Sequence, residues 1–342
     1  MSTREAPPRV APARSSLAPD PDGSPRAPVA SPGPALGVLG GSGLYDLEGL
    51  EGRAEEVVDT PFGAPSGPLV TGLIDGVKVV FLARHGRDHR LGPSEINSRA
   101  NIHALRQLGV HRLLSVSAVG SLREGIPPGH LVVVDQLIDR TYLRQKTFFE
   151  GGVVGHVSFA EPTCPQLDDA VAAVAARRGH PLASREARNL PPPPPPPPPS
   201  PSSPPPLHRG GTYVCMEGPQ FSTRAESLLH RGWGADVIGM TAAPEAKLAR
   251  EAEMCFSLLA LSTDYDCWRT DEAAVTAESV VAVLRANVAR ASHIVRDLAP
   301  YAATQARSCE CGRAAERAIL TAREGISPEA RARLHLLYGR YL

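Results

Sequence analysis

Short apolar runs alternate with helical patterns along most of this 342-residue chain, and the alternation constrains its fold more than any other feature. The runs lie between Leu36 and Leu298 and are rich in Val, Leu and Ile. Such runs are typical of strands that helices bury on both faces of a sheet. The alternation therefore predicts an α/β domain with a largely buried sheet.

The individual elements can be placed by residue range. Gly109 and Pro328 mark the expected end of one helix and the start of another. Strands are expected over Leu36 to Leu39, Val77 to Leu82, Leu113 to Ser117, Leu131 to Val134, Tyr213 to Met216, Val237 to Met240 and Leu258 to Thr263. Helices are expected over Asn97 to Leu108, Thr223 to Arg231, Pro244 to Glu253, Thr276 to Leu298 and Pro328 to Leu342.

Three segments differ in composition from the rest of the chain. Residues 1–34 are rich in Pro, Ala, Ser and Arg, and we expect a disordered N-terminal extension. In residues 191–206, thirteen of sixteen residues are proline and the others are serine, which favours a surface insertion within a domain over 35–300. A proline-rich ligand for a partner is the alternative. Residues 301–342 are expected to form a C-terminal helical extension.

The charge balance limits the partners that the chain can have. Lys plus Arg equals Asp plus Glu at 36 each, whereas nucleic-acid and membrane-surface binders usually carry a basic excess. No apolar run approaches the roughly 20 residues that a membrane span needs, and no signal-peptide pattern opens the chain. We therefore expect a soluble, cytoplasmic protein that binds neither nucleic acid nor membranes.

Six cysteines are scattered through the chain, and reduced thiols are expected in the absence of an export signal. The pair Cys309 and Cys311 could bind a metal ion. Because no histidine or second cysteine pair lies near it to complete a tetrahedral set, the sequence analysis predicts no metal site.

Two carboxylates follow the last apolar run, which ends at Thr263. Side chains alternate along a strand, so Asp264 and Asp266 would share one face if the extended geometry continues to Asp266. Two like charges in a buried cleft need hydrogen-bond donors. The exocyclic amine of a 6-aminopurine and a protonated ring nitrogen would supply them. A solvated acidic loop is the alternative interpretation.

Anion-binding groups stand at the ends of several expected strands. The first is the segment 40–43, Gly-Gly-Ser-Gly, in which Ser42 adds a hydroxyl to a glycine-rich turn. Because no strong helix start follows it, a dinucleotide-binding dehydrogenase is a distant second interpretation. Arg84 and His85 follow the second strand, and the segment 117–118, Ser-Ala, ends the third. The strand ends together predict a divided phosphate site.

Met240 and Thr241 end a fourth strand, where Met240 would offer an apolar surface for a sugar and Thr241 another hydroxyl for an anion. A methionine in such a run more often fills a core than contacts a ligand. The hypothesis therefore depends on the neighbouring strand ends.

Seven segments in order resemble the methylthioadenosine phosphorylase branch of the trimeric purine nucleoside phosphorylases. The resemblance covers about Leu36 to Leu298 and leaves out both tails and the proline insert. The segments are Gly40 to Leu44, Asp59 to Gly63, Ala83 to Arg87, Gly120 to Arg123, Glu217 to Ser222, Trp233 to Asp236 and Asp264 to Trp268.

The resemblance implies an α/β fold of one domain, with a mixed, twisted and partly barrel-like sheet flanked by helices. It also assigns roles by position. The base would be bound by Asp264, which would also be catalytic, together with Asp266, Phe221 and Ser222. Phosphate would be held by Ser42, Arg84, His85, Ser117, Ala118 and Thr241, and the ribose would lie against Met240. The pocket for the 5′ substituent would be lined by Ala277, Val280, Val281 and, from a neighbouring subunit, His156.

The resemblance further implies phosphorolysis of 5′-methylthioadenosine to adenine and 5-methylthioribose 1-phosphate, in purine and methionine salvage, by a cytoplasmic homotrimer. Inorganic phosphate would be a co-substrate, and no metal or organic cofactor is expected. Burial of Asp264 beside Asp266 is expected to raise its pKa so that it can donate a proton. The alternatives are a purine nucleoside phosphorylase for inosine or guanosine and a non-catalytic nucleotide-binding protein.

Overall fold

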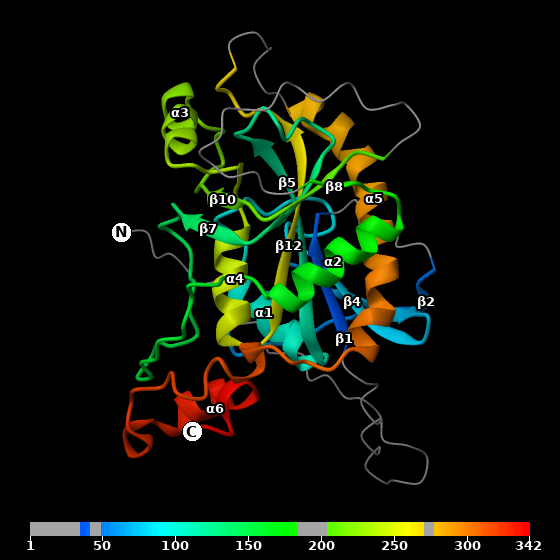
Figure 1. The fold of residues 1–342 in the computed structure, drawn as a ribbon. Coiled ribbons are helices and arrows are strands. Elements are labelled where there is room, and N and C mark those ends of the chain that lie inside the picture. Colours follow the sequence, from blue (N-terminus) through cyan, green and yellow to red (C-terminus); the bar gives the residue numbers. More distant parts are fainter. Residues whose placement is uncertain (1–34, 42–48, 184–203, 270–276) are drawn as a thin grey trace, which may run out of the picture. The chain divides into compact units, whose positions relative to one another are not determined.

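A mixed β-sheet runs through the part of the chain that the computed structural model describes, which comprises residues 35–41, 49–183, 204–269 and 277–342 (Figure 1). For residues 277–282 only the backbone is described. The expected N-terminal extension and most of the proline insert lie outside these ranges.

The sheet contains twelve strands within the described ranges. Nine of them form a path in the order β2, β3, β4, β1, β5, β12, β6, β9, β8. Their bounds are β1 Ala35–Gly40, β2 Glu51–Glu56, β3 Leu69–Ile74, β4 Val77–Ala83, β5 Val110–Ser121, β6 Leu131–Val134, β8 Leu182–Ala183, β9 Leu207–Arg209 and β12 Cys255–Asp264.

The central strands β4, β1, β5 and β12 run parallel to one another, whereas β2 and β3, β3 and β4, and β6 and β12 pair antiparallel. Parallel strands place their carboxyl ends at one edge of a sheet, where α/β proteins build their ligand sites. The residues that follow β1, β4 and β12 are therefore neighbours in the fold.

The remaining three strands branch from the end of β5. There, Gly120 and Ser121 pair antiparallel with Ile238 and Val237 of β11 (Val237–Gly239). Strand β10 (Thr212–Cys215) runs parallel to β11, and β7 (Gln136–Asp139) runs parallel to β10. The mixed sheet expected from the sequence is thus confirmed, and the branch adds a second direction to it.

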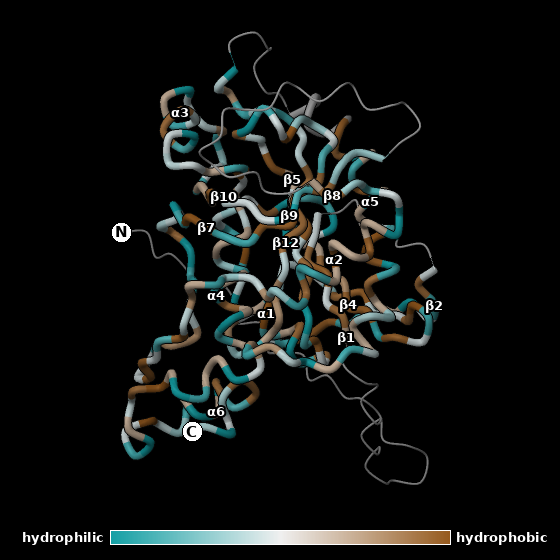
Figure 2. The backbone as a smooth tube through the Cα atoms, viewed as in Figure 1, coloured by the Kyte–Doolittle hydropathy of each residue, from teal (hydrophilic) through white to brown (hydrophobic). Residues whose placement is uncertain are grey.

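Two apolar cores lie on the two faces of the sheet, because successive side chains of a strand point to opposite sides. In β12, Phe256 and Leu258 face one core, whereas Leu259 and Leu261 face the other. Helices α1 (Ser98–Gln107) and α4 (Ala242–Glu251) cover the first face, and α2 (Pro165–Arg177) and α5 (Ala277–Thr304) the second (Figure 1). Figure 2 shows apolar residues concentrated in the inner strands around β1 and β4.

All the expected strands are present, and the helices begin and end close to the expected residues. Thr223 caps α3 (Arg224–Gly232) in a capping box with Glu226, and Gly109 ends α1 in the left-handed region at φ 85°. Strands β2, β3, β7, β8 and β9 and helix α2 are absent from the expectation. Strand β2 is polar and mostly exposed, so it carries no apolar run, and α2 is rich in alanine.

Most of the C-terminal extension packs against the first core, whereas Ala302 and Cys311 join the second. It comprises the 3₁₀ turns η2 (Glu310–Arg313) and η3 (Arg323–Gly325) and helix α6 (Pro328–Tyr338), which lies against α1. Leu334 and Leu337 of α6 join the core that α1 and α4 cover. Among the described helices, none is both long and apolar enough to cross a bilayer.

A stacked histidine pair, His130 and His208, should make folding stability pH-dependent. Nδ1 of His130 lies 2.8 Å from Nε2 of His208, and burial lowers the pKa of each side chain from 6.5 to about 4. Between these values the unfolded histidines bind protons while the folded ones stay neutral. The free energy of unfolding should therefore fall as pH falls from about 6.5 to about 4.

Chemical denaturation of the wild type, His208→Gln and the control His335→Gln, whose histidine is exposed, across pH 7 to 4 checks this expectation. The decline should be shallower in His208→Gln and unchanged in His335→Gln. Parallel curves for all three proteins would contradict it.

Candidate functional site

The centre of the candidate site is a buried ion pair between Arg84, the residue after β4, and Glu245 in the first turn of α4. Nε and Nη2 of Arg84 donate to the two carboxylate oxygens at 2.7 and 3.3 Å. The guanidinium also donates to the carbonyls of Leu39 in β1 and Val116 in β5, and to the hydroxyl of Ser115. The side chain thereby connects the residue after β4 with β1, β5 and the start of α4.

Two hydroxyls meet at the N-terminus of α4. The Oγ of Ser117 and the Oγ1 of Thr241 are 3.5 Å apart, and both residues are buried. Thr241 is the N-cap residue of α4, but its side chain makes no capping hydrogen bond. The unpaired backbone N–H groups and the dipole of a helix N-terminus favour an anion, and the two hydroxyls add donors. Ala118, the next residue of β5, brings its backbone to the same place.

His85 follows Arg84 and is neutral near pH 7. Burial, followed by the charge of Arg84, lowers the pKa of His85 to about 4. Its Nδ1 lies 2.8 Å from the carbonyl oxygen of Leu91, so Nδ1 carries the proton and Nε2 is an acceptor. Such an imidazole can accept a hydrogen bond from a protonated phosphate oxygen.

The paired ends of β5 and β11 lead from these hydroxyls to the two carboxylates. Because the strands are antiparallel, the register that sets Gly120 beside Ile238 also brings Ser117 to Thr241. A Cβ atom on Gly120 would lie 2.9 Å from Oδ1 of Asp264 and 3.2 Å from Cβ of Asp266. Only glycine leaves room for both aspartates at this position.

The structure corrects the expectation that Asp264 and Asp266 share one face of an extended strand. Strand β12 ends at Asp264, and Asp266 adopts φ 52°, so a turn brings the two side chains together. The N–H of Asp266 donates to Oδ1 of Asp264 at 2.8 Å, and Thr263 donates to Oδ2 at 2.7 Å. Among the residues that the structure describes, none forms a hydrogen bond with the buried Oδ2 of Asp266. A buried acceptor of this kind needs a donor from a ligand.

Met240 lies between Ile238 and Thr241, and so between the carboxylates and the hydroxyl pair along this strand end. Its contact with a sugar stays a prediction. A Cβ atom on Gly218 would lie 2.5 Å from its sulfur, which shows how closely the segment after β10 packs on it. Arg144 is a further residue of this region that was not predicted from the sequence. It is buried, and it donates to the carbonyl of Met240 and, at 3.1 Å, to the carboxylate of Glu217. A single arginine after β7 has no motif that would reveal it.

Ser222 lies near the aspartates, and Phe221 precedes it with about half of its surface exposed. The carbonyl of Ser222 accepts a hydrogen bond from the thiol of Cys267 at 3.1 Å, and its hydroxyl lies 3.7 Å from the sulfur of Met216. The expected base-pocket residues thus border the turn that carries Asp266.

Several expected site residues fall outside the described side chains. Ser42 lies in 42–48, and only the backbone is described for Ala277, Val280 and Val281. Their assigned contacts stay predictions.

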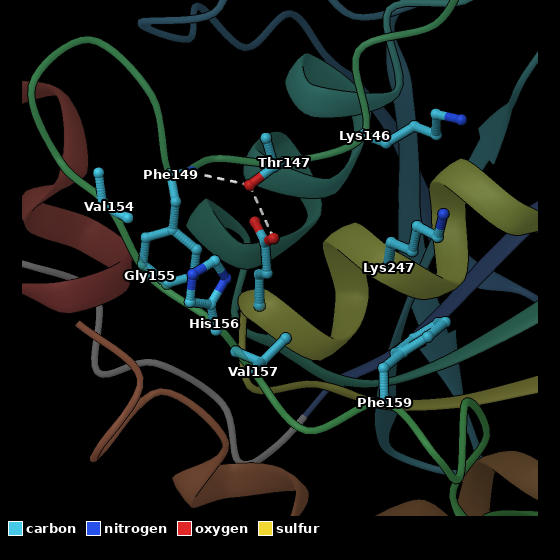
Figure 3. Close-up of a pocket in the computed structure, with 10 residues that line it drawn as sticks. Lys146, Thr147, Phe149, Val154, Gly155, His156, Val157, Phe159 and Lys247 are labelled. Carbon is cyan, nitrogen blue, oxygen red and sulfur yellow. Dashed lines mark hydrogen bonds between the residues drawn. The ribbon is translucent and has the colours of Figure 1, made fainter. Parts of the chain in front are cut away.

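His156 does not join the strand-end residues of its own chain. It lines a separate pocket with Phe149, Lys247 and Glu251, beside the C-terminal half of α4 (Figure 3). Thr241 stands at the opposite end of this helix. Burial raises the pKa of Glu251 to about 7, although Phe148 N–H and Thr147 donate to its carboxylate.

The chain belongs to the phosphorylase superfamily, whose family model matches residues 35–300. It is 49% identical to the S-methyl-5′-thioadenosine phosphorylase of Geobacter sulfurreducens, over 90% of this chain and 99% of that protein. It is 47% identical to the enzyme of the same name from Thermosynechococcus vestitus, again over 90% and 99%.

Two solved structures show the same fold. A methylthioadenosine phosphorylase from an antarctic soil metagenomic library is 40% identical with a TM-score of 0.78, and the match covers 90% of this chain and 99% of that one. The methylthioadenosine phosphorylase of Schistosoma mansoni in complex with adenine is 31% identical with a TM-score of 0.73, over 90% and 98%.

The hydroxyl pair at α4 predicts a measurable anion affinity. Inorganic phosphate should raise the midpoint of thermal unfolding of the wild type by mass action, and Thr241→Val should lose most of this shift because a donor is removed. Differential scanning fluorimetry over a phosphate series, compared with chloride at equal ionic strength, gives the measurement. Thr304→Val, a change at an exposed threonine near the end of α5, is the control and should keep the full shift. Equal phosphate shifts in both variants would show that the anion binds elsewhere.

Proposed function

We propose that this protein cleaves S-methyl-5′-thioadenosine with inorganic phosphate to give adenine and 5-methylthioribose 1-phosphate. One observation carries the proposal. The antiparallel ends of β5 and β11 join an anion site, made by Ser117 and Thr241, to a pair of carboxylates packed on Gly120.

The spacing along β5 suits a nucleoside. Ser117 and Gly120 are three residues apart, which corresponds to roughly 10 Å in an extended strand. A ribose fits between a phosphate at one end and a purine at the other, and Met240 on the facing strand end offers it an apolar surface. Arg84, held by Glu245, keeps the phosphate end in place. A direct contact between phosphate and the remaining guanidinium N–H of Arg84 stays a prediction.

The reaction breaks the bond between C1′ and N9 and forms a bond between C1′ and a phosphate oxygen. The transition state has oxocarbenium character on the sugar, so a phosphate anion beneath the ring stabilises it and then acts as the nucleophile. The electrons of the broken bond move to the purine, which takes a proton at N7. We assign the delivery of this proton to Asp264, in agreement with its position at the end of β12.

The acceptor at Asp266 favours a 6-amino base. The exocyclic amine of adenine is a donor and can satisfy the buried Oδ2, whereas the 6-oxo group of hypoxanthine or guanine is an acceptor and would face a carboxylate. Two observations support a preference for a 5′-methylthio group. The similar proteins are S-methyl-5′-thioadenosine phosphorylases, and apolar residues are expected around Val280 and Val281.

We further propose that the chain forms a cytoplasmic homotrimer whose substrates are the nucleoside and phosphate, without a cofactor for the reaction. The position of His156 supports this assembly. His156 lies beside the C-terminal half of α4, whereas Thr241 lies at its N-terminus. It would therefore contribute to the nucleoside site of a neighbouring subunit and not to that of its own chain.

Substitution of Asp264 tests its role. Asp264→Asn should lower kcat with methylthioadenosine by about 10²- to 10⁴-fold, the usual contribution of a general acid, and leave the KM for phosphate nearly unchanged. Asp75→Asn, in an exposed turn at φ 49°, is the matched control and should keep wild-type kinetics. Comparable turnover by Asp264→Asn and the wild type would refute the assignment.

A substrate panel tests the function itself. Methylthioadenosine, adenosine and inosine should be assayed with and without phosphate, with release of the free base followed by absorbance. We expect phosphate-dependent adenine release that is fastest with methylthioadenosine. Faster cleavage of inosine would indicate a 6-oxopurine enzyme, and no phosphate-dependent release from any nucleoside would favour a non-catalytic binding protein.

A further inference from the structure

Four cysteines that are far apart in the sequence meet at one place in the fold. Cys255 is the first residue of β12, and Cys164 directly precedes α2. Cys309 directly precedes η2, and Cys311 lies within it. All four sulfur atoms lie within 4.8 Å of one another. The prediction of no metal site assumed that no second pair of cysteines lies near Cys309 and Cys311. This premise is wrong, because β12 and α2 bring two thiols from distant positions in the sequence.

The sulfur spacing is that of a tetrahedral metal site. With a Zn–S distance of about 2.3 Å, the sulfurs of a tetrathiolate lie roughly 3.8 Å apart. The Sγ atoms of Cys255 and Cys309 are 3.4 Å apart, well beyond the length of a disulfide bond, about 2.05 Å. All four are free cysteines in the structure, and each of their sulfur atoms lies within 4.8 Å of the other three.

Two arginine side chains lie beside the four cysteines. Nη1 of Arg250 lies 3.8 Å from the sulfur of Cys311. The guanidinium of Arg307 also forms a side-chain hydrogen bond with Cys255. Four thiolates with a divalent cation carry a charge of −2, which two guanidinium groups can balance. Three of the four cysteines are buried, as a closed structural site requires.

We propose that Cys164, Cys255, Cys309 and Cys311 bind one Zn²⁺ ion in a closed tetrahedral site. The ion is structural, because four protein ligands leave no open position for a substrate or water. Its distance from the candidate active site agrees with this role. Cys255 and Asp264 are the two ends of β12, roughly 30 Å apart in an extended strand of ten residues.

The ion would attach the C-terminal extension to the sheet. Residues 309–311 open this extension, and its next residues pair with the loop that carries His156. The N–H of His156 donates to the carbonyl of Ala318 at 2.9 Å, and Gly155 forms a bridge with Ile319. A metal ion at η2 therefore stabilises the segment that holds this loop.

Metal analysis of the purified full-length chain tests the proposal. The protein is expressed without a histidine tag in medium supplemented with zinc and purified without chelators. Elemental analysis should find about one zinc per chain. Replacement by Co²⁺ should give the intense visible absorption of a tetrahedral cobalt thiolate, and removal of the metal should lower the midpoint of thermal unfolding.

The double variant Cys309→Ser/Cys311→Ser should lose the zinc and the cobalt spectrum. Cys215→Ser, which changes a buried cysteine of β10 outside the cluster, is the control and should keep both. If the double variant fails to fold, the zinc content and the cobalt spectrum of the wild type still decide the question, because they need no variant. Equal zinc content in the double variant and the wild type would overturn the proposal.

A thiol titration in denaturant with chelator and without reductant separates the remaining outcomes. Six titratable thiols together with one zinc per chain support the site. Six thiols without zinc or cobalt binding would show ordinary core cysteines, and two thiols without metal would show two disulfides. Either of these results would overturn the proposal.

Discussion

The buried pair of Arg84 and Glu245 is the interaction on which the candidate site depends. An unpaired charge at this depth would be strongly destabilising, so the guanidinium must keep its partners. These partners belong to the strands β1 and β5 and to α4. Ser117 follows Val116, and Thr241 opens the helix that carries Glu245. The ion pair therefore positions the anion site without being replaced by the anion.

The branch of the sheet supplies the second half of the site. If β5 ended with the parallel strands around it, Gly120 would have no partner beyond β12 and the path toward the carboxylates would be missing. Its antiparallel pairing with β11 continues the sheet past the anion site. The same pairing places Met240 between the two ends of the proposed site. In the function that we propose, strand register sets the spacing that suits a nucleoside, and the side chains at the two ends then select the base.

The segments of the site could be identified from the sequence, but their geometry could not. Asp264 and Asp266 were located by the apolar run before them, yet the turn at Asp266 depends on packing against Gly120. Arg144 has no sequence signal because its partners, Glu217 and Met240, come from distant segments. His156 belongs to a recognisable segment, but the structure sets it apart from the strand ends of its own chain.

The sequence by itself determined the fold class, the inner strands and the chemical groups at their ends, because local periodicity and turn residues encode these features. Only the tertiary structure decided which distant groups meet. The Arg84–Glu245 pair joins residues 161 positions apart, and the four-cysteine cluster joins three separate parts of the chain. Such contacts depend on strand order and register across the whole sheet, and no local pattern along a single chain carries that information.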